Sequence, residues 1–244
     1  MTATDYYSPA AEFFDLVGHR HLVSSAPALR AALAGLDTGN GPVLDIGAGT
    51  GLVTATIADV LPSARIVSAE PSPVMRAVLT SRVFSDPALR GRVTVLPEPA
   101  QELPLPDSLS AVVIFGVAGH IPRPERIALW KRLADRLPEG APIVVELMGV
   151  DTPRSIPFVR MCREAVGEQV YEWWISGEPA GEGVMRWRTE WRVFRGGERV
   201  RTVADEYDWE TFGVERLAEE SGLTVKRLAR TGRESTPEIG VLLK

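Results

Sequence analysis

The chain has few of the residues from which disulfides and metal sites are built. Cys162 is the only cysteine among 244 residues, so no disulfide can form within one chain, and a reducing compartment such as the cytoplasm is expected. The three histidines and this cysteine show no metal-ligand spacing, so we predict no metal. No G-x-S-x-G pattern supports hydrolase chemistry either.

Positive charge and long apolar runs are also scarce. The formal net charge is −5, only three of the 27 basic residues are lysines, and there is no basic tail. Nonspecific nucleic-acid binding relies on neutralising phosphates, so we expect no nucleic-acid partner. No apolar run reaches the about 20 residues of a membrane span, and no signal-peptide core follows the first residue. These absences predict a soluble, cytoplasmic protein.

A glycine-rich turn follows the first strand pattern. Residues 43–46 are apolar except for Asp45, residues 47–51 read Gly-Ala-Gly-Thr-Gly, and residues 53–61 have helical periodicity. Such a corner lets a ligand approach the main chain beside the positive end of a helix. A dinucleotide or S-adenosylmethionine would fit. The dinucleotide fingerprint is one residue longer, and Asp45 would repel a pyrophosphate but attract a methionine ammonium, so we favour S-adenosylmethionine.

Residues 43–51 resemble motif I of the class I S-adenosylmethionine-dependent methyltransferases, and the resemblance extends over residues 40–150. Glu70 ends the second strand pattern, about 20 residues past the glycines, where the family binds the ribose hydroxyls. Residues 71–75 resemble the segment that lies against adenine, and residues 103–108 resemble the family's loop before the fourth strand. The resemblance implies a cofactor that leaves as S-adenosylhomocysteine and is bound by Asp45, Gly47, Ala48, Gly49, Gly51, Glu70, Pro71, Met75, Ala100, Gln101 and Phe115.

The chain departs from the family where adenine is bound. Many members carry an aspartate that binds the adenine amino group, and Pro99 stands in its place here. Recognition of adenine then falls to Glu98, to Gln101, or to the main chain around Ala100 and Gln101. The glycine turn and Glu70 are untouched by this change.

Alternating apolar strands and amphipathic helices predict an α/β fold with four regions. Its Rossmann-like, mostly parallel, seven-stranded sheet has helices on both faces and an antiparallel last strand. Residues 1–40 form an N-terminal helical cap and residues 41–148 the cofactor-binding core. Residues 149–209 are an insertion with a substrate lid and an added antiparallel β-hairpin. Residues 210–244 supply a helix and strands that complete the sheet of a single structural domain.

Within these regions, the patterns predict particular elements. Two cap helices are expected at 11–17 and 27–36, a helical stretch near 158–166, and the hairpin over 184–207. This arrangement is similar to methyltransferases that act on amino groups, including those of nucleotide-bound sugars. The edge of the hairpin could also pair two copies of the chain as a homodimer.

Two side chains are candidates for catalysis. His120 follows the fourth strand, where open α/β sheets bind ligands, and histidine is the usual base near neutral pH. We predict that it contacts the acceptor or acts as a base, with a backbone-bonded loop histidine as the alternative. Glu146 lies inside an apolar strand, where a charge needs a partner or a cleft. It would bind a cationic acceptor or pair with an arginine.

Five more residues are candidate contacts. Tyr6 and Tyr7 would close over the acceptor and the cofactor, respectively, and Arg20 would approach the cofactor carboxylate. Trp173 and Trp174 would wall the acceptor pocket, or else pack in the core.

Three functions are consistent with these residues. The favoured one is N- or O-methylation of a small molecule, such as a secondary metabolite, by S-adenosylmethionine. A methyltransferase fold could instead catalyse a cyclisation or rearrangement without methyl transfer, because fold does not fix function. The third is a non-catalytic, cofactor-binding protein, against which the intact glycine turn argues.

Overall fold

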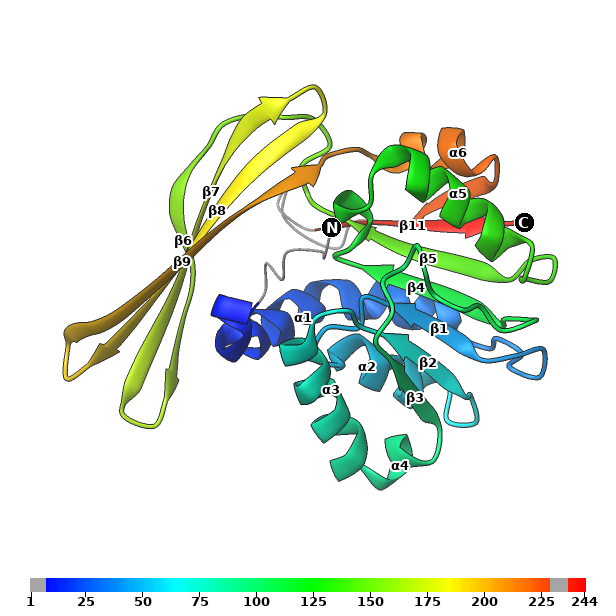
Figure 1. Cartoon of the computed structure of the whole chain (residues 1–244), viewed down its shortest axis with the longest axis horizontal. Coiled ribbons are helices and arrows are strands. Elements are labelled where there is room, and N and C mark those ends of the chain that lie inside the picture. Colours follow the sequence, from blue (N-terminus) through cyan, green and yellow to red (C-terminus); the bar gives the residue numbers. More distant parts are fainter. Residues whose placement is uncertain (1–7, 229–236) are drawn as a thin grey trace.

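A seven-stranded sheet forms the centre of the molecule (Figure 1). The computed structural model describes residues 8–228 and 237–244. The strand order is β10-β11-β5-β4-β1-β2-β3, in which β11 runs antiparallel to β5 and to β10 and the other pairs are parallel. The predicted α/β fold and its antiparallel last strand are therefore confirmed. The strands are β1 (Val43–Ile46), β2 (Ile66–Ala69), β3 (Val93–Leu96), β4 (Ala111–Phe115), β5 (Pro142–Leu147), β10 (Thr224–Leu228) and β11 (Glu238–Leu243).

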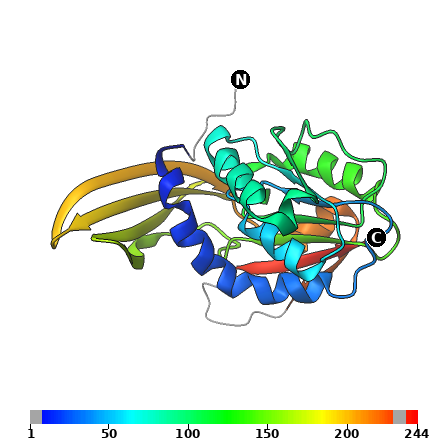
Figure 2. The same ribbon diagram turned by 90° about the horizontal axis from the view of Figure 1, so that it is seen from below.

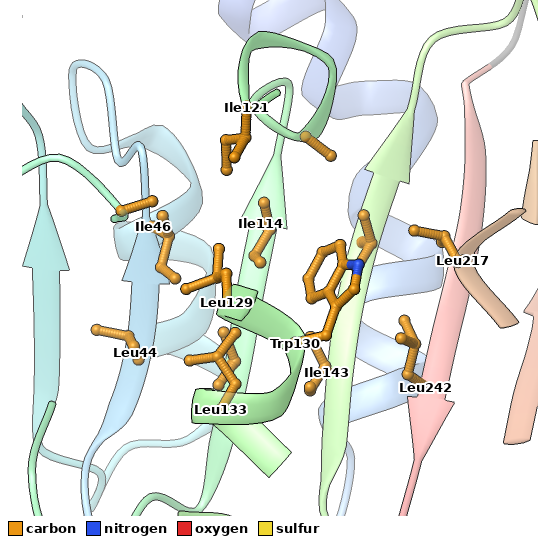
Figure 3. Packing of buried hydrophobic residues seen from close by; sticks show 14 of the residues in the cluster. Leu44, Ile46, Ile114, Ile121, Leu129, Trp130, Leu133, Ile143, Leu217 and Leu242 are labelled. Carbon is orange, nitrogen blue, oxygen red and sulfur yellow. The ribbon is translucent and has the colours of Figure 1, made fainter. Parts of the chain in front are cut away.

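Helices cover both faces of this sheet. Alternate residues of each strand point to opposite faces. Leu44 and Ile46 lie in the cluster under α5 (Figure 3), whereas Val43 belongs to the cluster under α1 and α2. The helical elements are η1 (Ser8–Phe13), α1 (Phe14–Leu33), α2 (Leu52–Val60), α3 (Pro73–Ser85), α4 (Pro87–Arg90), η2 (Ala118–His120), α5 (Arg123–Ala134) and α6 (Val214–Ser221). None of the helices in the described ranges is long and apolar enough to cross a membrane.

The N-terminal cap differs from the prediction. Instead of two helices joined at Gly18, one continuous helix runs from Phe14 to Leu33. Gly18 lies where α1 crosses α2, and a Cβ there would come within 2.6 Å of the Leu52 side chain. The glycine that suggested a break thus permits close helix packing. Leu29 and Leu33 bury the apolar stripe of α1 against the core.

The insertion is a separate antiparallel sheet of four strands that extends from one side of the core (Figures 1 and 2). The predicted hairpin is its β8 (Val184–Arg195) and β9 (Glu198–Glu210). The helix predicted near 158–166 is wrong, because this segment lies in the edge strand β6 (Ile156–Val166), which pairs with β7 (Gln169–Gly181). Most residues of β6 are exposed, and two register shifts interrupt its pairing with β7. The sequence of β6 therefore lacks the apolar–polar alternation by which a half-buried strand is recognised.

The inner face of this second sheet packs on the core and on the N-terminal segment. Trp191 stacks on Phe13 of η1 with ring centres 4.8 Å apart. Trp187 is buried with Trp209 beside Met148 and Val150, which follow β5. The second sheet therefore contacts both η1, which precedes β1, and the segment that follows β5.

Candidate functional site

The carboxyl ends of β1, β2 and β3 form a continuous edge. The amides of Gly47 and Ala48 donate to the carbonyl of Ala69 at 2.8 and 3.0 Å. The amide of Glu70 donates to the carbonyl of Leu96 at 3.0 Å. The turn after β1, the acid after β2 and the segment after β3 therefore lie side by side. Open α/β sheets bind their ligands at this edge.

The glycines shape the turn after β1. Gly47, Gly49 and Gly51 have φ values of 69°, 56° and 89°, in the left-handed region that side chains disfavour. A Cβ on Gly51 would also come within 2.6 Å of Leu79. Any side chain at these positions would strain the backbone that leads into α2.

Glu70 is buried at the edge, and its carboxylate is held by the main chain. Oε2 accepts the amide of Gly49 at 2.8 Å, and Oε1 accepts the amide of Ser72 at 2.8 Å. The acid predicted to bind ribose thus connects the glycine turn to the start of α3. Its contact with ribose stays a prediction.

Asp45 lies beneath the turn and is 1 % exposed. Its Oδ2 accepts the hydroxyl of Thr54 at 2.5 Å, and that hydroxyl lies 3.0 Å from Ser68 Oγ. Burial raises the pKa of Asp45 to about 7, although the Thr54 hydrogen bond lowers it, and Glu70 adds a further upward effect. Asp45 therefore stabilises the turn at a cost in desolvation, and its attraction for an ammonium stays a prediction.

The segment after β3 narrows the choice of adenine contacts. The Gln101 amide donates to Glu125 at 2.7 Å. Arg132 Nη1 donates to the main-chain carbonyls of Gln101 and Ala100 at 2.7 and 3.5 Å. In contrast, Glu98 Oε2 is buried without a hydrogen-bond partner. Glu98 Oε2 is therefore a buried acceptor to which a ligand could donate.

The other expected cofactor contacts border the same edge. Met75 is buried in the first turns of α3, where Ser72 caps the helix, and Pro71 immediately follows Glu70. Phe115 ends β4 and is 8 % exposed. Their contacts with a cofactor stay predictions.

His120 lies in η2, the turn that follows β4. Its ring meets Trp209 of β9 edge-on, with ring centres 4.6 Å apart, and lies 5.6 Å from the ring of Tyr207. Burial lowers the pKa of His120 to about 4, so the imidazole is neutral at pH 7. Burial also raises the pKa of Tyr207. The predicted histidine thus lies where the core meets the second sheet.

Glu146 pairs with a histidine rather than an arginine. Its Oε2 lies 2.9 Å from His21 Nε2 of α1, and its Oε1 is buried without a hydrogen-bond partner. Burial alone would lower the pKa of His21, but the charge and hydrogen bond of Glu146 outweigh it and raise the pKa. The exposed guanidinium of Arg20 lies 3.6 Å from Glu164 of β6, and its contact with a cofactor carboxylate stays a prediction.

The tryptophan pair does not form one wall. Successive residues of a strand face opposite sides. Trp173 packs on the inner face, 6.0 Å from the ring of Trp191, whereas Trp174 stacks on Phe158 at 5.3 Å. The two rings therefore face opposite sides of the second sheet, and the contact of either with an acceptor stays a prediction. Tyr6 and Tyr7 lie outside the described residues.

Sequence reasoning missed Tyr207, Trp209 and Arg126. Tyr207 and Trp209 are two residues apart in β9, and this spacing places both side chains on the same face of the strand. Arg126 is buried on α5, three and four residues before the apolar pair Leu129 and Trp130. A charge on the apolar stripe of a helix was the available signal for it.

An open hollow lies at the opposite edge of the sheet. It measures about 540 Å³ and is bordered by residues 40–42, 65–67, 90–94 and 106–108, at the amino ends of β1, β2 and β3. Ligands of open parallel sheets bind at the carboxyl ends, so the hollow is not the candidate site. Among residues 8–228 and 237–244, no group of three or more His, Cys, Asp or Glu side chains could hold a metal ion.

Comparison with known proteins agrees with this geometry. The family model of the methyltransferase domain matches residues 43–140. The ubiquinone/menaquinone biosynthesis C-methyltransferase UbiE of Geobacter sulfurreducens is 32% identical over 124 residues, which are 50% of this chain and 46% of that protein. The chain thus spans about half the length of this curated relative.

Solved structures extend the likeness over the second sheet. DesVI of Streptomyces venezuelae is 18% identical with a TM-score of 0.75, covering 99% of each chain. CalS10, an amino pentose methyltransferase from Micromonospora echinaspora solved with S-adenosylmethionine, is 17% identical with a TM-score of 0.68, covering 92% of this chain and 91% of that one. These likenesses show the shared fold. The domain match over residues 43–140 agrees with the predicted methyltransferase core and with S-adenosylmethionine as the expected cofactor.

Proposed function

We propose that the protein is an S-adenosylmethionine-dependent N-methyltransferase that acts on an amino group of a small, sugar-like natural product. The observation that carries the proposal is His120, a neutral imidazole at the carboxyl end of β4 and against the rings of β9. In this proposal, α1 covers the cofactor and the second sheet covers the acceptor. The amino pentose methyltransferase CalS10, which has the same two-sheet fold, supports the choice of an amine.

The edge of the sheet fits the cofactor in the order of its parts. The turn after β1 would hold the methionine, Glu70 the ribose and Glu98 the adenine amino group. The unpartnered acceptor of Glu98 fits this assignment, because a buried acceptor without a donor costs about 1–3 kcal/mol until a ligand supplies one. When bound, S-adenosylmethionine supplies an electrophilic methyl group.

The basicity of His120 favours an amine over a hydroxyl acceptor. An alcohol needs a base to remove its proton as it attacks, and a base with a pKa of about 4 assists this weakly. A neutral amine already carries its lone pair. His120 would accept a hydrogen bond from the amine N–H and orient that lone pair, and Glu146 Oε1 would accept a second N–H from the ligand.

A methyl-transfer assay tests the function. The wild type and the variants His120→Asn and His19→Asn are incubated with labelled S-adenosylmethionine, amino sugars (free and nucleotide-bound) and the matching hydroxyl sugars. We expect methylated amines in a 1:1 ratio with demethylated cofactor. His120→Asn should lower kcat about 100-fold, because the amine loses its orienting contact, whereas His19→Asn should leave it unchanged. Methylation of hydroxyls alone would overturn the choice of an amine, and a product formed without demethylated cofactor would indicate the non-methylating alternative.

The role of Glu98 is tested by binding alone. Titration calorimetry compares S-adenosylhomocysteine with its inosine counterpart, in which an oxygen replaces the adenine amino group. We expect the wild type to prefer the amino form about 10-fold or more, which corresponds to about 1.4 kcal/mol. Glu98→Ala should lose this preference, while the exposed Glu102→Ala should keep it. An unchanged preference in Glu98→Ala would assign adenine recognition to other groups.

A further inference from the structure

Arg126 of α5 is a fully buried charged residue, with 0 % of its surface exposed. Its Nε and Nη2 donate to the two carboxylate oxygens of Glu220 on α6 at 2.7 and 2.8 Å. Its Nη1 donates to Glu210 at the end of β9 at 2.8 Å. Its guanidinium also stacks on the ring of Phe212 at 4.0 Å. Burial works against the charged form, but the bonds to both glutamates outweigh this and raise the pKa of Arg126.

A buried cluster of this kind is not needed to stabilise a fold. Well-packed apolar side chains of similar volume often replace buried ion pairs without loss of stability. A fully satisfied polar network does fix the relative positions of the elements that it joins. The positions that Arg126 fixes therefore indicate its role.

Those positions surround His120. Nη1 of Arg126 also donates to the carbonyls of Ala118 and Ile121, at 3.2 and 2.8 Å. These two carbonyls bracket the η2 turn that carries His120. One guanidinium thus binds the backbone on both sides of the histidine.

The same guanidinium fixes what packs against the histidine. Glu210 directly follows Trp209, whose ring meets His120 edge-on. The Trp209 ring also lies on Gly119, where a Cβ would come within 2.1 Å of the ring. Arg126 therefore joins the turn of the core to the strand of the second sheet that encloses His120.

We propose that Arg126 is a positioning residue that holds the His120 turn against β9 and so keeps the imidazole enclosed at the acceptor site. The catalytic part of this inference rests on the proposed function of His120. Arg126 would not touch the acceptor. It would act through the carbonyls of η2 and through Glu210.

Other charged groups near the cluster do not duplicate this arrangement. Arg123 of α5 is half exposed and lies 3.3 Å from Glu220. Trp130 of α5 lies 3.5 Å from the same carboxylate. The groups that face the enclosed region are thus Arg123 and Arg126 from α5, Glu220 from α6, and Glu210 and Tyr207 from β9.

The test follows His120 directly by NMR. The sequence has three histidines, His19, His21 and His120, so the imidazole titrations can be assigned with His120→Asn. Arg126→Lys keeps the charge but cannot make the forked contacts. The double variant Arg126→Met with Glu220→Leu removes the buried pair together and guards against misfolding of the single variant. Arg186→Lys, which changes an exposed bidentate pair between Arg186 of β8 and Asp208 of β9, is the matched control.

Three readouts are compared in these variants: the His120 titration, the affinity for S-adenosylhomocysteine, and kcat with the amine acceptor. In the wild type, His120 should titrate near pH 4. In Arg126→Lys and in the double variant, its midpoint should rise by one unit or more toward 6.5. For the same variants, kcat should fall about 10- to 100-fold while cofactor affinity stays within twofold. Arg186→Lys should change none of the three.

The outcomes separate this inference from the proposed function. If folded Arg126→Lys and the double variant titrate and turn over like the wild type, Arg126 does not position His120 and the inference is wrong. If the loss of kcat is matched by an equal loss of folded protein, the role is structural and the inference is also wrong. If the titration shifts as expected but no acceptor is methylated by any variant, the positioning stands and the proposed function fails.

Discussion

Replacing Asp45 by asparagine separates the stability of the glycine turn from its affinity for the cofactor. Asparagine has the same shape and keeps an oxygen that can accept the Thr54 hydroxyl. It lacks the charge that would attract a methionine ammonium. The substitution should therefore make the protein more stable and its cofactor affinity weaker.

The size of the stability effect follows from the pKa of Asp45. Burial raises it from 3.8 to about 7, and each pKa unit corresponds to about 1.36 kcal/mol. Above pH 7 the buried carboxylate is charged in both the folded and the unfolded chain, so its burial penalises the fold by up to about 4 kcal/mol. As the pH falls from 7 toward 4, the folded chain takes up a proton that the unfolded chain does not, and the penalty disappears. The free energy of unfolding of Asp45→Asn should therefore exceed that of the wild type by the largest amount at pH 8. At pH 4 the two proteins should be equally stable.

Urea denaturation at pH 4, 6 and 8 measures this difference. Asp59→Asn is the control, because Asp59 is an exposed aspartate of α2 paired with Arg30 at the surface. It should change stability by less than about 1 kcal/mol, nearly independently of pH. Calorimetry with S-adenosylhomocysteine should show Asp45→Asn binding about 10-fold or more weakly. A variant that is less stable than the wild type at pH 8, or a difference that does not vary with pH, would refute the reasoning.

Three further predictions concern other residues of the site. Glu70→Ala should weaken S-adenosylhomocysteine binding about 100-fold, since it removes charged acceptors worth about 1.5–3 kcal/mol; an unchanged Kd by calorimetry would remove Glu70 from the ribose site. Gly119→Ala should lower the free energy of unfolding by about 1–3 kcal/mol, because its Cβ collides with Trp209; wild-type stability in urea would contradict the packing. His21→Ala should destabilise the protein, because Glu146 loses its partner. Since Glu146 raises the pKa of His21, the pair stabilises the fold fully below pH 6.5 and less as His21 deprotonates, so the loss should be larger at pH 6 than at pH 9. Equal losses at both pH values would show that the ion pair contributes nothing.

The parallel core could be predicted because its patterns are local. The run from Val43 to Gly51 combines a buried strand, glycines and an amphipathic helix within a few residues. Parallel strands covered on both faces are short apolar runs, and these are easily distinguished from the amphipathic helices between them. The positions of Glu70 and His120 followed from the same rule, since Glu70 directly follows β2 and His120 lies in the short turn after β4.

The second sheet could be predicted only in part, because its stability comes from non-local contacts. The β8 and β9 strands alternate and share a Gly-Gly turn, so their hairpin was visible in the sequence. The β6 strand is an exposed edge with register shifts, and its spacing resembled a helix. Pairing with β7, rather than local propensity, decides its conformation.

The partners of the site residues were the least predictable. His21 and Glu146 are 125 residues apart in sequence, and Arg126 and Glu220 are 94 apart. Nothing in the local sequence indicates which distant charge will neutralise a buried one. The sequence shows only that such a residue needs a partner.

Calorimetric titration of the wild-type protein with S-adenosylhomocysteine tests the central claim most directly, because it requires no acceptor. The glycine turn, Glu70 and Glu98 together predict one cofactor site per chain, with a Kd of about 1–100 μM. It also predicts that Glu70→Ala loses most of this affinity while Asp59→Asn keeps it. Absence of binding at millimolar ligand, or binding that survives Glu70→Ala unchanged, would contradict the account of this edge as the cofactor site.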